Sequence, residues 1–247
     1  MITSIINRKG GVGKTGTAHA LGAGLMKKGY KVLFVDLDSQ ANLSYAIGAD
    51  SSNLSTVDIL TGEAAAQEAI QHTAQGDIIA GSEALAGADA FLTDTGKEYR
   101  LKEALQPLLE EYDYIIIDTP AALNVLTVNA LTASTNGIIP VQADLFSLQG
   151  IGLLYKAIDR IKKYCNHDFY IDGILLTRYN GRAIISQDMR DNLEEMARQL
   201  QTKLYKVPVR ECIAVKEAQA QQTDIFSYAP RSNAATDYMA LVEEYLQ

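Results

Sequence analysis

The feature that most constrains this chain is a glycine-rich turn between an apolar segment and a helical pattern near its start. The apolar segment is residues 3–7, and the turn that follows it has glycine at three of the four positions 10–13. After the turn, Ala18, Leu21 and Leu25 recur at the spacing of one helical face. A strand that turns tightly into a helix is the building unit of parallel α/β sheets. The start of the chain therefore predicts an α/β fold.

Short apolar runs alternate with helical patterns along the rest of the 247 residues. Such runs suit strands that are buried on both faces of a sheet and joined by crossover helices. We expect strands over residues 3–7, 31–36, 77–80, 114–118, 137–141 and 170–177. We expect helices over 148–161 and 189–200, and a last helix, capped by Ser232, that buries Ala234, Tyr238, Leu241 and Tyr245. The prediction is one domain, residues 1–247, with a doubly wound, mostly parallel sheet and helices on both faces.

The composition argues against several classes of protein. With 47% hydrophobic and 21% charged residues, the chain has the makeup of a folded protein. A net charge of −8 argues against a protein that coats nucleic acid with its whole surface. Met1 leads directly into an apolar segment, and no apolar run approaches the about 20 residues of a membrane helix. Cys165 and Cys212 lack the spacing of metal ligands, so we expect a cytoplasmic protein with reduced cysteines.

The glycine-rich turn has the residue order of a phosphate-binding loop, which is Arg8-Lys9-Gly10-Gly11-Val12-Gly13-Lys14-Thr15. Glycines let backbone N–H groups curve around phosphates at the positive end of the following helix. We expect the stretch from Lys9 to Gly16 to bind nucleotide. Lys14 would reach the β and γ phosphates, and the Thr15 hydroxyl would ligate Mg²⁺. The strict pattern has glycine where this chain has Arg8.

The block from Lys9 to Thr15 resembles the deviant Walker A motif of the ParA/MinD ATPases. The signature residue of that family is an additional lysine at the position of Lys9, which reaches across a dimer interface to the partner's nucleotide. The resemblance implies an ATP- and Mg²⁺-dependent homodimer in which Lys9 and Lys14 both act in catalysis. It also implies a slow, partner-stimulated ATPase on a P-loop fold of the deviant Walker A type.

Two acidic segments extend the resemblance. Residues 35–42 are similar to the family's D-x-D-P-Q-x-N segment, with Ser39 in place of the proline. By resemblance, Asp38 orients the attacking water and Asp36 helps to organise the Mg²⁺ shell. The apolar run 114–117 ends in Asp118, which is similar to the Walker B arrangement and implies a contact with Mg²⁺ through water.

Further matches extend over essentially the whole chain. Residues 119–129 correspond to the family's switch segment, in which Ala121 and Ala122 replace the usual proline and serine. Residues 139–142, 175–180 and 207–210 continue the resemblance, and the last of these implies that Pro208 contacts the base. Gly16 stands where relatives commonly have threonine.

The branches of the family differ in what the switch acts on. A cluster carrier needs paired thiols, a pattern that Cys165 and Cys212 do not resemble. A MinD-like protein binds membrane through a basic terminal helix, but this chain has no Lys or Arg after Arg231. The partition-protein branch remains. It implies ATP-dependent non-specific DNA binding at the nucleoid, a centromere-binding ParB-like partner, no membrane binding, and segregation of plasmids, chromosomes or mobile elements.

Basic residues of the later half form the candidate DNA-binding surface. They are Arg178, Arg182, Arg190, Lys203, Lys206, Arg210 and Lys216. Contacts of this type neutralise phosphates without distinguishing sequence, so DNA binding should be weak and salt-sensitive. Two alternatives stay open, a cargo-positioning scaffold with a weak or vestigial ATPase and a MinD-like membrane-associated positioning ATPase. The scaffold alternative stays open because the chain departs from the family pattern at Gly16, Ser39 and Ala121. A metabolic ATP-using ligase is more distant, because no substrate-specific acid or base cluster stands out.

Overall fold

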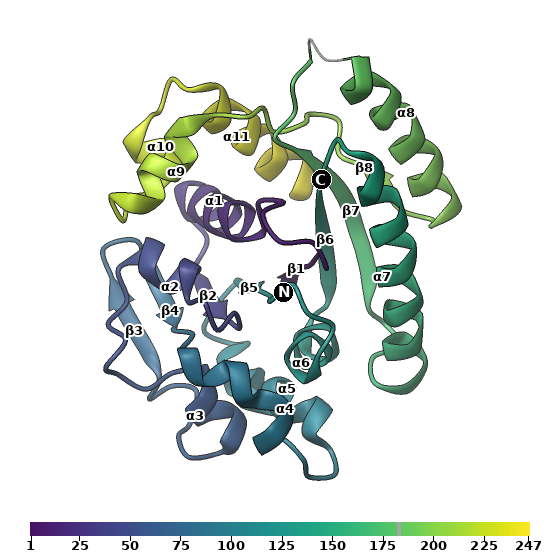
Figure 1. Ribbon diagram of the computed structural model, residues 1–247. Coiled ribbons are helices and arrows are strands. Elements are labelled where there is room, and N and C mark those ends of the chain that lie inside the picture. Colours follow the sequence, from purple (N-terminus) through teal and green to yellow (C-terminus); the bar gives the residue numbers. More distant parts are fainter. Residues whose placement is uncertain (182–183) are drawn as a thin grey trace.

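The structure is a computed structural model that describes residues 1–181 and 184–247 (Figure 1). Within these ranges, eight strands form one sheet with the order β3-β4-β2-β5-β1-β6-β7-β8. The strands are β1 (Ile2–Ile5), β2 (Val32–Asp36), β3 (Ile70–Thr73), β4 (Gly76–Ile79), β5 (Tyr114–Asp118), β6 (Asn136–Gln142), β7 (Tyr170–Thr177) and β8 (Lys203–Leu204). Neighbouring strands in the described ranges pair in parallel, except that β3 is antiparallel to β4.

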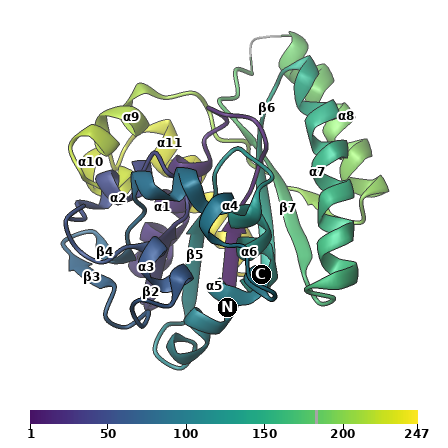
Figure 2. The same cartoon turned by 60° about the horizontal axis from the view of Figure 1, so that its bottom comes forward.

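Helices cover both faces of this sheet (Figures 1 and 2). The α-helices are α1 (Lys14–Lys27), α2 (Asn42–Ile47), α3 (Thr56–Thr61), α4 (Ala88–Phe91), α5 (Arg100–Leu105), α6 (Val125–Ala133), α7 (Leu145–Tyr164), α8 (Ile184–Gln199), α9 (Ile213–Ala220), α10 (Ile225–Tyr228) and α11 (Asn233–Tyr245). Short 3₁₀ turns are η1 (Glu83–Gly87), η2 (Lys97–Tyr99) and η3 (Gln106–Leu108). The helices α1, α2 and α9 to α11 pack on one face, and α3 to α8 pack on the other. The predicted doubly wound α/β class is confirmed.

The apolar strand runs predicted from the sequence are buried on both sides. In β5, Ile116 packs in the cluster that contains α1, whereas Ile115 and Ile117 pack under the helices of the opposite face. Of the six predicted strands, β5 and β7 have the predicted bounds, and the other four differ at their ends by one or two residues. The sequence analysis missed β3 and β8. The side chains of β3 are polar or half-buried, and β8 has only two residues.

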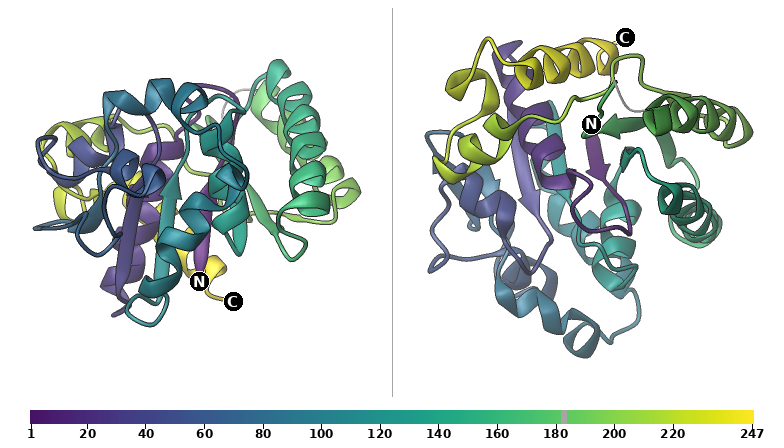
Figure 3. Two further views of the ribbon diagram at one scale, coloured as in Figure 1. Left: turned by 90° about the horizontal axis from the view of Figure 1, so that it is seen from below. Right: turned by 45° about the horizontal axis from the view of Figure 1, so that its top comes forward.

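The last helix begins as the sequence predicts. The Ser232 side chain accepts a hydrogen bond from the Ala235 N–H at 3.1 Å, which satisfies a donor at the helix start. The four residues predicted to face the core, Ala234, Tyr238, Leu241 and Tyr245, are all buried. Tyr245 also joins the chain's end to its beginning, because its hydroxyl lies 2.5 Å from the hydroxyl of Thr3 in β1. The left view of Figure 3 shows the two ends of the chain close together.

At Gly22 and Gly24, helix α1 packs against its neighbours with no space for a side chain. A Cβ added to Gly22 would overlap the ring of Phe34 in β2, and one added to Gly24 would overlap Val242 of α11. Glycine at these positions therefore allows the sheet on one side and α11 on the other to approach the helix backbone closely. The helix that begins at the glycine-rich loop is fixed on two sides.

The strand register brings the candidate site residues to one edge of the sheet. Asp36 at the end of β2 lies beside Asp118 at the end of β5, and Asp118 lies beside Ile5 at the end of β1. The glycine-rich loop leaves β1 at this same edge. Carboxyl ends of parallel strands are where α/β sheets bind their ligands.

None of the helices in the described part of the chain combines the length and apolar character needed to cross a membrane.

His19 is a buried titratable residue on α1. Its ring meets Phe34 edge-on, with 6.1 Å between the ring centroids, and its Nε2 has no hydrogen-bond partner among the described residues. Burial lowers the pKa of His19 to about 4. The folded protein therefore holds this ring neutral at a pH at which the unfolded chain would protonate it.

We predict that His19→Leu removes a pH-dependent loss of stability. The unfolded chain protonates His19 below a pKa of about 6.5, whereas the folded protein does so only near 4, so acid favours unfolding of the wild type. Relative to the variant, the wild type should lose roughly 1 kcal/mol of unfolding free energy between about pH 7.5 and about pH 5.5. Urea unfolding of both proteins across this range measures the difference. A constant difference would contradict the assignment.

Candidate nucleotide-binding site

The glycine-rich loop has the backbone shape that its glycines permit. Gly11 and Gly13 have φ angles of +74° and +86°, in the left-handed region that favours glycine. Gly13 is also the cap residue of α1, and Val12 between them is buried. The loop therefore places several backbone N–H groups at the positive end of a helix, which is an arrangement that binds phosphate.

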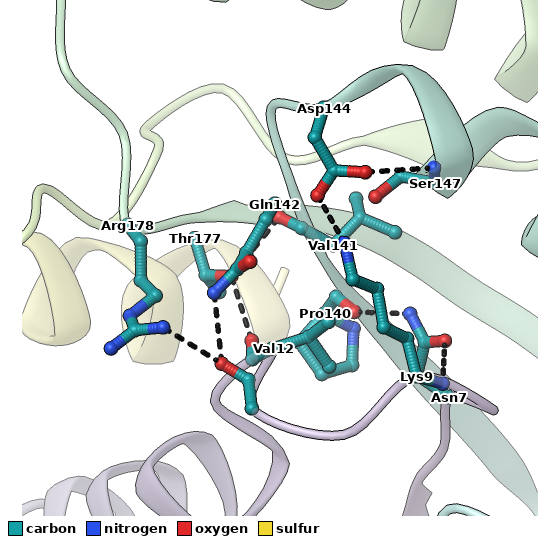
Figure 4. Close-up of polar contacts among 11 residues, drawn as sticks. Asn7, Lys9, Val12, Pro140, Val141, Gln142, Asp144, Ser147, Thr177 and Arg178 are labelled. Atoms are coloured by element: carbon teal, nitrogen blue, oxygen red, sulfur yellow. Dashed lines mark hydrogen bonds and ion pairs between the residues drawn. The ribbon is translucent and has the colours of Figure 1, made fainter.

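Side chains from the ends of β6 and β7 hold the carbonyl groups of this loop (Figure 4). The Gly11 carbonyl accepts hydrogen bonds from Gln142 Nε2 at 2.8 Å and from Arg178 Nη1 at 3.2 Å. The Val12 carbonyl accepts one from the Thr177 hydroxyl at 2.8 Å. These contacts fix the curvature of the loop through its carbonyl oxygens without using the N–H groups that phosphate binding requires. Gln142 and Thr177 belong to the segments 139–142 and 175–180 that resemble the family, but the sequence did not predict these contacts.

The two lysines of the loop lie in different environments. Lys14 is buried, and its Nζ donates to the Lys9 carbonyl at 3.3 Å. Burial lowers the pKa of Lys14, while the nearby Asp118 and Asp38 raise it. Lys9 points outward, and its Nζ pairs with the Asp144 carboxylate of its own chain, with 39% of the Lys9 side chain exposed. Asp144 is a partner that the sequence analysis missed.

Asp118 lies at the base of the site with one oxygen paired. Its Oδ2 accepts a hydrogen bond from the Thr15 hydroxyl at 2.6 Å, whereas its Oδ1 has no partner among the described residues. Burial, followed by the charge of Asp36, raises the pKa of Asp118 to about 8. An under-coordinated buried carboxylate next to a threonine hydroxyl fits a hard cation such as Mg²⁺. The two predicted metal partners Thr15 and Asp118 therefore lie together.

Asp36 is held by hydrogen bonds from the protein, and its expected part in the Mg²⁺ shell stays a prediction. It is fully buried, and its Oδ2 accepts hydrogen bonds from the Ser44 N–H at 2.9 Å and the Ser44 hydroxyl at 2.8 Å. Its Oδ1 accepts the N–H of Asp38 at 3.0 Å. Burial raises the pKa of Asp36 to about 6. These bonds tie the end of β2 to the start of α2. They also hold the loop that carries Asp38.

Asp38, the residue expected to orient water, is half-buried and lines the cleft beside the loop. Its Oδ1 accepts the Gln40 N–H at 3.1 Å. Gly81, which sequence reasoning missed, supports this turn, because a Cβ there would lie 2.9 Å from the Asp38 carbonyl oxygen. A carboxylate on a supported turn and open to the cleft has the placement needed to orient a water molecule.

The loop forms the floor of a cleft of about 1120 Å³. One wall comes from residues within 38–45, 85–86 and 120–126, which include Asp38 and part of the expected switch segment. A second wall comes from residues within 177–178 and 209–220 and from Tyr238. Pro208 is not among the described residues that line the cleft, although Val209 and Arg210 are. A base contact by Pro208 stays a prediction.

Three of the residues expected to bind DNA line this cleft instead of a separate surface. They are Arg178, Arg210 and Lys216. The Arg210 guanidinium donates to both oxygens of Asp237, at 2.6 and 2.9 Å, and its backbone N–H donates to the same carboxylate at 3.0 Å. Because Asp237 is only 2% exposed, this pair fixes Arg210 at the wall of the cleft.

The other candidates lie beside α8 or outside the described residues. Arg190 Nη2 donates to the carbonyl of Lys206 at 3.0 Å, and Lys203 Nζ lies 3.3 Å from Asp172. Arg182 is not among the described residues. The described candidates therefore form two groups, one in the cleft and one near α8 and β8. DNA binding by either group stays a prediction.

We predict that Asp118→Asn changes how the metal-free protein responds to pH. Because the folded pKa of Asp118 is raised to about 8, ionisation of this group opposes folding progressively as the pH rises above its unfolded pKa near 4. Relative to the variant, the wild type should lose about 2 kcal/mol of unfolding free energy between about pH 5 and about pH 7. Denaturant unfolding in a chelator measures the difference. Parallel pH profiles for the two proteins would refute the assignment.

Comparisons with known proteins agree with this geometry. Residues 1–171 match the protein family described as an AAA domain. The sporulation initiation inhibitor protein Soj of Bacillus subtilis is 38% identical, over 98% of this chain and 97% of that protein. The chromosome partitioning protein ParA of Myxococcus xanthus is 34% identical, over 100% and 88%. The solved structure of cobyrinic acid a,c-diamide synthase from Mycobacterium smegmatis, with a bound ATP analogue and magnesium, is 31% identical over 98% and 92%, with a TM-score of 0.85.

Proposed function

We propose that this chain, which belongs to the ParA/Soj family of P-loop ATPases, is a switch that dimerises when it binds ATP and Mg²⁺. In the dimer it would bind DNA without sequence preference and segregate a plasmid, chromosome or mobile element together with a centromere-binding ParB-like protein. The observation that carries the proposal is the placement of Lys9 and Lys14 around one loop. Lys14 is buried beneath the loop, and Lys9 lies on its outer side.

The ion pair of Lys9 is the part of the site that dimerisation would change. Lys9 and Asp144 are 39% and 31% exposed, and an ion pair this open to water contributes little to stability. Phosphate groups of a nucleotide held by a second subunit carry several negative charges and would compete with one carboxylate for Lys9. In this scheme Lys9 leaves Asp144 only when a second ATP-bound subunit faces it, which makes dimerisation depend on ATP.

The residues of the cleft divide the chemistry of hydrolysis among themselves. Lys14 neutralises phosphate charge from within the loop, and Thr15 with Asp118 holds the magnesium ion. Bound Mg²⁺ would withdraw charge from the phosphate oxygens. Asp38 orients the water that attacks the γ-phosphate. Asp36 fixes the turn that carries Asp38, through its bonds to Ser44 and to the Asp38 N–H.

We expect Asp38→Ala to separate ATP binding from hydrolysis. The variant should still form ATP-dependent dimers, because the loop and both lysines are unchanged, while ATP turnover falls by at least about 100-fold, as for removal of a water-positioning group. Size-exclusion chromatography with light scattering measures the dimer, and phosphate release measures turnover. Ser39→Ala, in the same turn, is the control. Turnover equal to that of the wild type would refute the role of Asp38.

Variants of the Lys9 ion pair test the switch itself. Lys9→Ala should remain monomeric with ATP, whereas Asp144→Asn should dimerise at a lower ATP concentration because Lys9 no longer pairs with a carboxylate. The double variant should behave like Lys9→Ala. Sizing each protein over an ATP titration, with ADP as the control nucleotide, gives the result. A dimer of Lys9→Ala as stable as that of the wild type would rule out the switch.

The DNA and partner steps need a separate test. If the proposal is correct, the wild type should be retained on random-sequence DNA only with ATP, and added salt should weaken retention because the contacts are to phosphates. Lys203→Gln and Lys206→Gln test the group near α8, and Lys102→Gln on α5 is a control of equal charge change. ATP-dependent dimers that bind no DNA would favour the second candidate, a cargo-positioning scaffold, which Ser39 and Ala121 in the cleft keep open.

A further inference from the structure

Three side chains surround Gly16 at the second wall of the cleft. A Cβ added to Gly16 would lie 3.4 Å from Cγ1 of Val215, 3.6 Å from the hydroxyl of Tyr238 and 3.9 Å from the Nε2 of Gln219. All four residues line the cleft. Figure 1 shows α9, which carries Val215 and Gln219, and α11, which carries Tyr238, in the group of helices next to α1. The absence of a side chain at Gly16 leaves the Gln219 amide close to the phosphate-binding loop.

Nucleotide binding at the loop would place the nucleoside against this wall. The phosphates would bind at the loop. Of the residues assigned to the γ-phosphate and its metal, Asp38 lies in the first wall, and Asp118 is hydrogen-bonded to Thr15 at the end of the loop. A nucleotide whose γ-phosphate faces the first wall would extend its sugar and base toward the second wall. Gln219 and Tyr238 belong to that second wall, next to the residue that follows Thr15.

The residues around Gln219 in this wall are held by burial and hydrogen bonds. Tyr238 is buried, and its burial raises its pKa to about 12, so the hydroxyl beside Gly16 stays protonated. The preceding residue, Asp237, holds Arg210 through three hydrogen bonds. Gln219 itself is half-buried on the last turn of α9, and its neighbour Ala218 packs in the core.

We propose that Gln219 recognises the N6/N7 edge of adenine and makes the cleft selective for ATP. In a nucleotide with the common anti orientation, the N7 side of the purine is the side nearest its own phosphates, and the Gln219 amide lies next to the loop that holds them. A side-chain amide can donate to N7 and accept from the 6-amino group at the same time. A 6-oxo purine offers acceptors at both positions, so the amide satisfies only one of them.

Binding of ATP, ITP and 7-deaza-ATP tests this assignment, because ITP lacks the 6-amino group and 7-deaza-ATP lacks the N7 acceptor. The wild type should bind ATP roughly tenfold more tightly than either analogue, which is the scale of one bidentate contact. In Gln219→Leu, ATP affinity should fall to the level of the analogues, and the analogues should change little. Gln222→Leu is the matched control, because Gln222 lines a different cavity, next to β3.

Equal loss of all three nucleotides in Gln219→Leu would overturn the proposal, as would a wild type that does not distinguish ATP from ITP. Gly16→Thr provides a second variant, because its γ atoms would fill the space between the loop and Gln219. It should reduce the preference for ATP over ITP, and an unchanged preference would count against the proposal. The inference rests on nucleotide binding in the cleft and not on dimerisation or DNA. If the wild type binds ATP but is not retained on DNA, the inference about Gln219 still stands.

Discussion

The constraint on which the site depends is a carboxylate, Asp118, buried at the end of β5 beside a second buried carboxylate. Only one of its oxygens has a partner among the described residues, the Thr15 hydroxyl. Ionisation at such a position is unfavourable unless a cation is nearby. The arrangement that opposes ionisation in the metal-free protein therefore favours a complex of cation and phosphate. The strands, the loop and Lys14 converge on this point.

Three acids at one sheet edge have different environments because their hydrogen bonds differ. Asp36 accepts three bonds from the protein and holds a turn, Asp118 has an oxygen left for a cation, and Asp38 is open to the cleft. Their positions in the sequence are similar, since each stands at or just after a strand end. Burial and the identity of the neighbouring donors separate them, and neither follows from the motif alone.

The sequence predicted well what depends on local pattern. The bounds of β5, the glycine conformations of the loop and the Ser232 cap all follow from short stretches of chain. Contacts between distant segments did not follow. Asp144 meets Lys9 across 135 positions, and Arg210 lies in the cleft because it pairs with Asp237 on α11. No local signal marks these pairs. The strand β3 was missed because its polar, half-exposed residues lack the apolar run of a central strand.

The close packing around α1 limits where this molecule can respond to its ligand. With Phe34 against the backbone of Gly22 and Val242 against that of Gly24, the helix has no room to slide or rotate without displacing the sheet or α11. The helix therefore holds the phosphate loop in a fixed position. Rearrangement on gaining or losing a phosphate would then occur outside α1, in segments that line the cleft such as residues 120–126. Helix α1 would keep its position, and any change that depends on the ligand would occur in the exposed residues around it.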